Sequence, residues 1–299
     1  MISRILVPLD GSPLAEMVLP YVREMASRTK AEVLLLTSVQ PVTVWDATAT
    51  TFSLDREESF AMAYLDGKRE AMAAAGLKTR ARVVQGPAAE SILKVAAEEK
   101  TDLITMSTHG RSGLTRWLFG SVANKVLEGT TTPLLLVRSS REAKREKPAA
   151  IDKVLVPLDG SSVAESVLPF VEDVAAAFGA SIVLYHAITP LSAYPGFETV
   201  LPANAGEVLD DLQQQAQQFL SRVADEVRER GIDVSVMVSV DLAVDGILAA
   251  AREAGAGLIA LGTHGRSGLG RAVMGSVADA VVRRAEVPCL LVHPKEPKK

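Results

Sequence analysis

Short apolar runs alternate along this chain with longer stretches in which apolar and polar residues follow helical spacing. The apolar runs are rich in Val, Ile and Leu and are continuous, which is typical of strands buried on both faces of a parallel sheet. In the first half they predict strands at 2–9, 32–39, 81–85, 103–106 and 134–137. Strands that alternate with helices predict a doubly wound α/β fold, with helices on both faces and right-handed crossovers.

The stretches between the strands predict helices. One begins after Ser12, a favourable N-cap residue, with Pro13 in its first turn. In the second half, Ser162 and Glu165 have the spacing of a capping box. The other predicted helices lie at 57–75, 87–99 and 120–129, with counterparts near 204–230, 242–254 and 275–285. The stretches at 40–56 and 189–206 are predicted to be long loops, which in compact domains are often functional.

The two halves repeat one sequence pattern. Residues 5–12 read Ile-Leu-Val-Pro-Leu-Asp-Gly-Ser and recur at 154–161 with one change, and Thr-His-Gly-Arg-Ser-Gly-Leu at 108–114 recurs at 263–269. A repeat this long indicates a domain duplication, because solenoid repeats run to about 20–50 residues. The pattern predicts a first domain at 1–138, a polar and basic linker at 139–150, a second domain at 151–294 and a tail at 295–299.

Each half carries a glycine-rich segment after its fourth strand. In the second half Gly262-Thr-His-Gly265 follows the strand, and Gly275-Ser276 opens the next helix. A glycine turn that leads into a helix N-terminus presents free N–H groups and the positive end of the helix dipole, which suit a phosphate. The spacing is neither that of a Walker A loop nor that of a nucleophile elbow. Because the full spacing occurs twice, it points to a ligand that carries phosphate.

A second repeated feature is the acid that follows the first strand of each half. Asp10 and Asp159 each come directly after a Pro-Leu pair. The first strand is central in a doubly wound sheet, so its carboxyl end lies at the topological switch point, where ligands bind. An acid there can accept hydrogen bonds from a ribose or an adenine amine. The alternative is a turn or helix-cap role. The neighbouring glycine segment favours ligand contact.

Composition and charge narrow the classes of function. The chain is 48% hydrophobic and 23% charged, with a net charge of −4. This acidic balance argues against nucleic acid as the main partner, because a protein that binds nucleic acid usually has a basic surface. No apolar run approaches the ~20 residues of a membrane span. Asp10 stands too early for a secretory segment, so we expect the cytoplasm. The one cysteine, Cys289, lies in an apolar run and is expected to be a buried thiol.

The histidines of the glycine segments, His109 and His264, are expected to be turn residues. No acid or second histidine accompanies them with the spacing of a catalytic triad or a metal site. We therefore expect no catalytic residues and no metal ligands. Arg266 in the same segment could contact a phosphate or be solvated, and the sequence leaves this open.

Together the Pro-x-Asp-Gly-Ser start, the Gly-x-x-Gly-x₉-Gly-Ser motif and the terminal Pro-x-x-x-Val strand resemble the universal stress protein family, most closely its tandem ATP-binding members. The resemblance covers both halves. It implies Rossmann-like domains, each a five-stranded parallel sheet of order 3-2-1-4-5, and pairing of the domains through their fifth strands as a pseudo-dimer, with a homodimer as a further option. The implied nucleotide-binding residues are Pro8, Asp10, Ser38, Met106, Ser107, Gly110, Gly120, Ser121 and Val122 in the first half, and Pro157, Asp159, Ala187, Leu261, Gly262, Gly265, Gly275, Ser276 and Val277 in the second.

One position departs from the motif of the family. The first motif glycine, Gly262 in the second half, is Ser107 in the first. If this position requires a left-handed backbone or a close approach to the ligand, serine weakens the first site. If it requires only a small residue, serine is harmless.

The expected function is that of an ATP-binding stress-response or regulatory protein, with ATP, with or without Mg²⁺, at one site in each domain. The alternative is a slow ATPase or phosphoryl-transfer enzyme that uses the same pockets, although the sequence supplies no clear general base or metal dyad. A third option is a nucleotide-independent interaction module, against which the two glycine motifs argue. The signalling partner cannot be named from the sequence.

Overall fold

The computed structural model describes residues 1–40, 47–108, 120–138, 150–193, 204–263 and 274–293, with side chains of the third helix described from residue 55. The chain divides into two compact units, Met1–Ala149 and Ala150–Lys299, called domain 1 and domain 2 below.

Domain 1 alternates strands and helices along its whole length. Its elements are β1 (Arg4–Pro8), α1 (Pro13–Glu16), α2 (Leu19–Thr29), β2 (Glu32–Val39), α3 (Ala47–Ala74), β3 (Thr79–Gln85), α4 (Ala88–Glu98), β4 (Leu103–Ser107), α5 (Ser121–Gly129) and β5 (Leu134–Val137). Domain 2 repeats this order. Its elements are β6 (Lys153–Pro157), α6 (Ser162–Glu165), α7 (Leu168–Phe178), β7 (Ser181–Ile188), the short 3₁₀ helix η1 (Leu191–Ala193), α8 (Ala205–Arg228), β8 (Val234–Val240), α9 (Ala243–Ala254), β9 (Leu258–Gly262), α10 (Ser276–Arg284) and β10 (Cys289–Val292).

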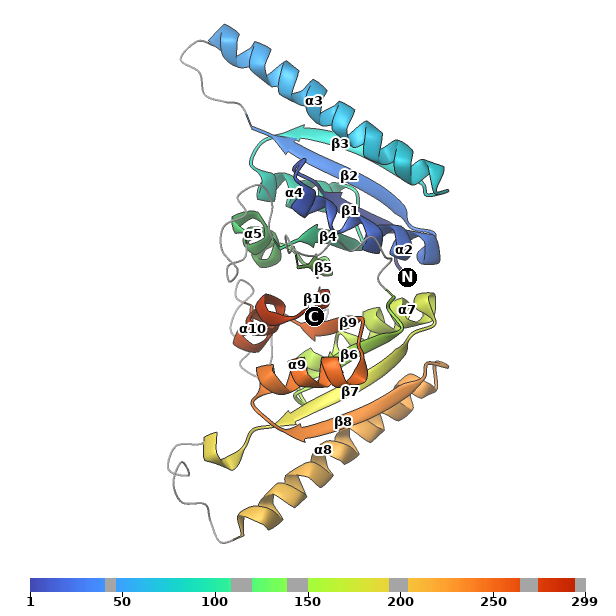
Figure 1. Ribbon diagram of the computed structural model, residues 1–299, viewed down its shortest axis with the longest axis vertical. Coiled ribbons are helices and arrows are strands. Elements are labelled where there is room, and N and C mark those ends of the chain that lie inside the picture. Colours follow the sequence, from blue (N-terminus) through green and yellow to red (C-terminus); the bar gives the residue numbers. More distant parts are fainter. Residues whose placement is uncertain (41–46, 109–119, 139–149, 194–203, 264–273, 294–299) are drawn as a thin grey trace, which may run out of the picture. The chain divides into compact units, whose positions relative to one another are not determined.

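The strands of each domain form a parallel sheet. Domain 1 has the order β3-β2-β1-β4-β5, and domain 2 has the equivalent order β8-β7-β6-β9-β10 (Figure 1). The predicted fold class and the strand order 3-2-1-4-5 are thereby confirmed. The long helices α3 and α8 pack on the β2–β3 and β7–β8 pairs, while α4 packs beside α5 and α9 beside α10 (Figure 1). Because β1 and β6 are central, their carboxyl ends lie at the switch point of each sheet.

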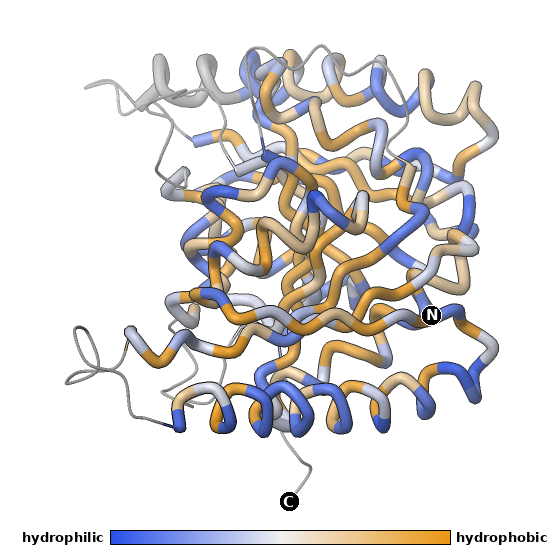
Figure 2. Tube along the Cα trace, turned by 60° about the horizontal axis from the view of Figure 1, so that its bottom comes forward, coloured by the Kyte–Doolittle hydropathy of each residue, from blue (hydrophilic) through white to orange (hydrophobic). Residues whose placement is uncertain are grey.

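The strands form the core of each domain. Figure 2 shows them coloured mainly as hydrophobic, whereas the helices alternate between apolar and polar residues. Ile5, Leu6 and Val7 of β1 are completely buried, as is Val154 at the same place in β6. In β10 the thiol of Cys289 is buried, and this burial raises its pKa to about 12. Continuous apolar runs therefore correspond to strands covered on both faces, as their sequence predicts.

Several helix boundaries differ from the prediction. Ser12 is the N-cap of α1, and its hydroxyl accepts a hydrogen bond from the Ala15 N–H at 3.1 Å, as expected. The expected single helix is nevertheless split into α1 and α2, because Pro20 has no N–H to continue the helical ladder. The predicted long loop at 40–56 is also wrong in part, since α3 begins at Ala47.

The predicted capping box of domain 2 is wrong by one residue. The N-cap of α6 is Ser161, whose hydroxyl accepts from the Ala164 N–H at 3.2 Å, while Ser162 is the first helical residue. The structural reason is the turn before the helix, which places Ser161 in extended backbone with φ −88° and ψ 146°. The cap therefore follows the same pattern as Ser12 in domain 1.

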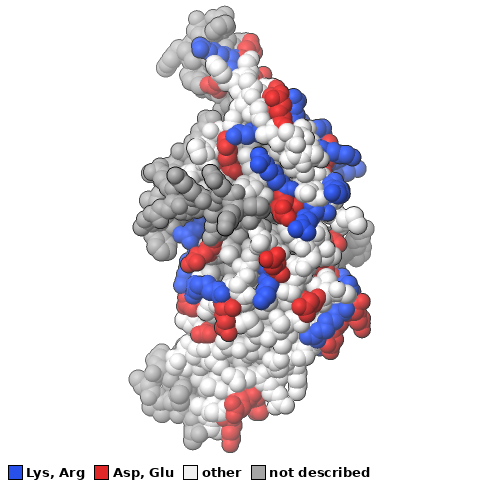
Figure 3. All heavy atoms as spheres, turned by 45° about the vertical axis from the view of Figure 1, so that its right-hand side comes forward, with Lys and Arg blue, Asp and Glu red and all other residues white. Residues whose placement is uncertain are grey.

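Domain 1 carries an ion-pair network at the start of its outer strands. The guanidinium of Arg80 contacts the carboxylates of Glu32 at 3.0 Å and Glu99 at 2.7 Å. On the face shown in Figure 3, acidic and basic side chains are interspersed. The positions of Glu32 and Arg80 in the strand register are occupied in domain 2 by Ser181 and Ser235. The two copies of the fold therefore differ in their surface electrostatics.

Candidate functional site

Domain 2 contains a cavity of about 230 Å³ at the carboxyl edge of its sheet. It is surrounded by the ends of β6, β7 and β9 and by the first turns of α9 and α10, with Ala164 of α6 beside them. The lining residues are Pro157, Leu158, Asp159, Ala164, Tyr185, Ala187, Ala243, Ile247, Leu261, Gly262, Thr263, Gly275, Ser276, Val277 and Ala278. This is the switch-point crevice, where α/β sheets bind ligands.

The turn after β6 places a carboxylate at the cavity. One oxygen of Asp159 accepts hydrogen bonds from the backbone N–H of Ser161 at 3.0 Å and from its hydroxyl at 2.6 Å. Gly160 between them has φ +84°, a left-handed conformation that favours glycine. Asp10 in domain 1 accepts from the Ser12 N–H in the same way, at 2.9 Å. The acid therefore has the turn role considered above, and Asp159 also lines the cavity.

The N-terminus of α10 opens into the cavity. Its N-cap is Gly275, with φ −59° and ψ 144°, and among the described residues no side chain caps the helix. The Gly275 N–H donates to the Thr263 carbonyl at 2.7 Å, and the Thr263 N–H donates to the Val292 carbonyl at 3.1 Å. These bonds anchor the helix start to the ends of β9 and β10. The first turn of α10 therefore lines the cavity, and a helix N-terminus at a cavity is an arrangement that favours an anion.

The structure brings together most of the residues expected to form the second site. Of the nine, Gly265 lies outside the described residues, and the other eight line the cavity. Two hydrophobic walls come from Ala187 of β7 and Leu261 of β9, while Ser276 supplies a hydroxyl at the helix start.

The residues expected in domain 1 occupy the same places in its fold. Pro8 ends β1, Ser38 lies in β2, and Met106 and Ser107 end β4. Gly120 is the uncapped N-cap of α5, and its N–H donates to the Thr108 carbonyl at 2.9 Å. Ser121 and Val122 form the first turn of α5, and Asp10 follows β1, whereas Gly110 lies outside the described residues.

The structure settles one of the two reasons why Ser107 could weaken the first site. Gly262 is the last residue of β9 and pairs with Val292, and Ser107 is the last residue of β4 and pairs with Val137. Both positions are therefore extended strand. Of the alternatives left open by the sequence, a left-handed backbone is therefore excluded, and only a close approach to the ligand would still distinguish glycine from serine here.

The remaining lining residues were missed from the sequence. They are Leu158, Ala164, Tyr185, Ala243, Ile247, Thr263 and Ala278. Ala243 and Ile247 lie four residues apart on α9, so they share a helix face. Tyr185 and Ala187 lie two residues apart on β7 and share a face of the sheet. These periodicities are visible in the sequence, but which face meets the cavity depends on packing. Burial raises the pKa of Tyr185, and nearby Asp241 adds to the effect, while a hydrogen bond from Ser239 opposes it.

Within the described part of the chain, no cluster of three or more His, Cys, Asp or Glu side chains is arranged to hold a metal ion. Among the helices described there, none is both long and apolar enough to cross a membrane.

Known proteins resemble both halves of the chain. A universal stress protein of Mycobacterium tuberculosis is 27% identical over 201 residues, which span 67% of this chain and 64% of that relative. A universal stress protein of Mycolicibacterium smegmatis is 24% identical over 298 residues, 97% of each chain. The crystal structure of a universal stress protein from Archaeoglobus fulgidus superposes with a TM-score of 0.74 at 22% identity, covering 98% of both chains, which supports the fold. The model of the universal stress protein family matches residues 1–138 and 150–293, and the chain belongs to that family.

Proposed function

We propose that this chain binds adenine nucleotide, ATP with or without Mg²⁺, at one site in each domain, and that it acts as a regulatory protein of the stress response. The observation that carries the proposal is the uncapped start of α10, which faces the same cavity as the carboxylate of Asp159. One end of the cavity suits phosphate, and the other offers an acceptor for a ribose or an amine.

The cavity is suited to the base of a nucleotide, while the phosphates would lie at its opening. Its volume of about 230 Å³ is small beside the roughly 300–1,000 Å³ of typical ligand pockets. Apolar side chains, including Ile247 and Leu261, form much of its lining and suit a planar base. The phosphates would then lie at the mouth, where Gly275 keeps the N-cap free of a side chain and Ser276 adds a hydroxyl.

Two measurements test the proposal. Mass spectrometry of small molecules released from the purified, denatured chain should detect adenine nucleotide. Thermal unfolding with Mg-ATP at a hundredfold excess over Kd should show about 2.7 kcal/mol of stabilisation, because ligand binds the native state alone. A double variant, Gly120→Val with Gly275→Val, is the control and should show no shift. If millimolar ATP leaves wild-type melting unchanged, the proposal is wrong.

The same preparation separates binding from catalysis. Steady release of ADP and phosphate from added ATP, abolished in the double glycine variant, would favour the slow ATPase. Binding without turnover would favour the regulatory function.

A further inference from the structure

The cavity of domain 2 has one aromatic wall whose counterpart in domain 1 is aliphatic. In the strand register, Tyr185 pairs with Pro157 at the end of β6, as Leu36 pairs with Pro8 at the end of β1. Tyr185 lines the cavity and is 1% exposed, so its ring is a fixed part of the wall. The duplicated fold thus places different side chains at one position of two equivalent sites.

Two neighbouring positions change together with Tyr185. Its hydroxyl hydrogen-bonds the hydroxyl of Ser239 on β8 at 2.7 Å. On α9, a Cβ at Gly246 would collide with the Tyr185 hydroxyl and stand 3.3 Å from its ring carbon Cζ. Gly246 therefore leaves the space that the tyrosine fills, and Ser239 anchors the ring.

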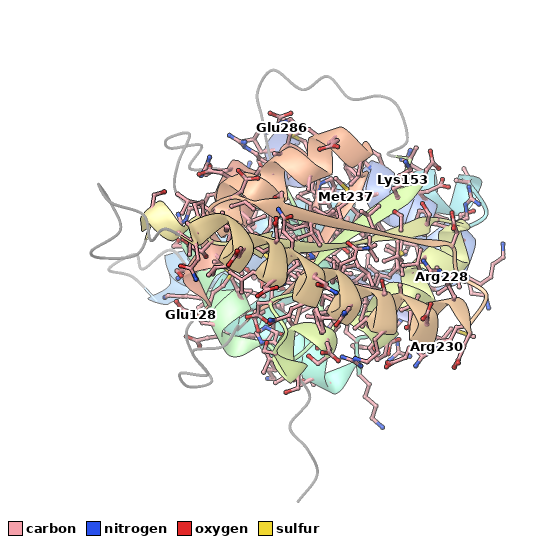
Figure 4. All side chains as sticks on the ribbon, turned by 90° about the horizontal axis from the view of Figure 1, so that it is seen from below. Glu128, Lys153, Arg228, Arg230, Met237 and Glu286 are labelled. Carbon is pink, nitrogen blue, oxygen red and sulfur yellow. The ribbon has the colours of Figure 1, made fainter. Side chains whose placement is uncertain are left out.

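Domain 1 has a different side chain at each of these three positions. The counterpart of Ser239 is Val84, because each pairs with the equivalent residue of the neighbouring strand, Ala187 or Ser38. The counterpart of Gly246 is Ser91, the fourth residue of α4 as Gly246 is of α9. A shorter Leu36 leaves room for a side chain at Ser91, and Val84 has no hydroxyl to offer. In Figure 4, Met237 marks the position on β8 that pairs with Tyr185.

We propose that Tyr185 is a specificity-determining residue of the domain 2 site. Its ring contacts the planar base of the nucleotide, while Ser239 and Gly246 hold the ring in place. The inference rests on the proposed function, since it assigns the base to this part of the cavity. An aromatic contact of this kind is worth a few-fold to about tenfold in affinity. Domain 2 then selects for the base more strongly than domain 1.

Exchange of the three residues between the domains tests the inference. In a Gly120→Val background, which blocks domain 1, the triple variant Tyr185→Leu, Ser239→Val and Gly246→Ser gives domain 2 the residues of domain 1. Calorimetry should show affinity for ATP and adenosine reduced about three- to tenfold, with affinity for inorganic triphosphate unchanged. Tyr185→Phe retains the ring and should lose less than the triple variant.

The reciprocal exchange keeps the inference testable if the triple variant of domain 2 does not fold. In a Gly275→Val background, Leu36→Tyr, Val84→Ser and Ser91→Gly should raise the affinity of domain 1 for adenosine by a similar factor. If the Gly120→Val parent binds ATP and the triple variant binds ATP and adenosine equally well, the inference is wrong. If the triple variant does not fold by circular dichroism, the reciprocal exchange decides, and no gain in domain 1 overturns it. If wild type binds no nucleotide at either site, the proposed function itself has failed.

Discussion

The backbone N–H of Gly275 donates a 2.7 Å hydrogen bond to the carbonyl of Thr263, and Gly120 makes the same bond to Thr108 in domain 1 at 2.9 Å. Each bond fixes the first turn of a helix beside the end of the fourth strand of its sheet. The positive end of the helix dipole is therefore held at the switch point, and the N-cap itself is a glycine with no side chain to cap the helix. A side chain added at this N-cap acts directly on the proposed phosphate site.

The first prediction concerns this N-cap. Gly275→Val should abolish one of two nucleotide equivalents, with at least a tenfold loss of affinity, because a branched side chain obstructs the approach of phosphate. The backbone at φ −59° and ψ 144° accepts valine, so the cost to stability should stay near the ~1 kcal/mol of a poor N-cap. Calorimetric stoichiometry checks the result, and Gly120→Val is the matched variant for domain 1. Two remaining equivalents in Gly275→Val would contradict it.

The second prediction separates the two roles of Asp159. Asp159→Asn keeps an oxygen to accept from the Ser161 N–H, so the melting temperature should change little. Loss of the charged acceptor should weaken ATP by about 0.5–1.5 kcal/mol and leave inorganic triphosphate unaffected. Asp159→Ala should lose the turn as well, and thermal melts should show that further destabilisation. Unchanged ATP affinity in the folded asparagine variant would limit Asp159 to the turn.

The third prediction concerns Ser107, which stands where domain 2 has the first glycine of the motif, Gly262. Because Gly262 is extended strand, Gly262→Ser introduces no backbone strain and should change the unfolding free energy by no more than about 1 kcal/mol. Domain 2 should lose less than tenfold in ATP affinity, and Ser107→Gly should gain by a similar factor in domain 1. Calorimetry in the Gly120→Val and Gly275→Val backgrounds measures each site alone. A loss larger than tenfold would show that the phosphates need the glycine itself.

The fourth prediction is a pH dependence in domain 2. Burial raises the pKa of Glu172 above its ordinary value of 4.5, although Arg230, which hydrogen-bonds it and follows α8 (Figure 4), opposes the effect. The folded state therefore holds this proton more tightly than the unfolded chain, and stability falls as pH rises through the raised pKa. Glu172→Gln should remove that loss, so the variant should gain stability relative to wild type as pH rises from about 4.5.

Circular dichroism melts between about pH 4 and pH 7.5 measure this difference. Glu229→Gln, which removes an exposed carboxylate at the end of α8, is the control and should track wild type. A difference between Glu172→Gln and wild type that stays constant with pH would refute the prediction.

The fifth prediction concerns the ion-pair network of domain 1. Arg80→Ala should cost about 1 kcal/mol at low salt, because Arg80 bridges two carboxylates, and most of this cost should vanish at 1 M salt. Unfolding in urea followed by circular dichroism, at low salt and at 1 M salt, measures both costs. Lys94→Ala is the control. It removes an exposed ion pair to Glu98 with a long N–O distance of 3.9 Å, and it should have little effect on stability at either salt concentration. Equal losses at both salt concentrations would rule out an electrostatic origin.

The sequence predicted the strands best. The ranges 32–39 and 134–137 coincide with β2 and β5, because continuous Val, Ile and Leu runs have few stable alternatives to a doubly covered strand. The order of the strands came from the resemblance, since hydrophobic periodicity carries no information about which strands are neighbours. The split between α1 and α2 does not show in the hydrophobic pattern, because the apolar spacing continues across Pro20, and only the missing N–H of this proline signals it.

The site could be predicted from the residues alone where they repeat, and elsewhere through the family resemblance, which supplied Ala187 and Leu261. The glycines and acids of both halves stood out because they occur twice in the same spacing. Tyr185 did not stand out, because it differs from its counterpart Leu36. It also lies within an apolar strand, where an aromatic residue is expected to be part of the hydrophobic core. Its role depends on the approach of α9, and that packing is fixed by tertiary structure rather than by any local pattern.

The burial of Cys289 limits how this member of the family could respond to oxidants. It is the one cysteine of the chain, is 1% exposed, and has a pKa raised to about 12. Oxidants react with the thiolate, which is scarce at neutral pH under such a pKa and has no access to solvent in the folded state. Oxidation of a cysteine thiol is therefore closed to the folded protein, and the sulfur that oxidants can reach is that of exposed methionines such as Met62.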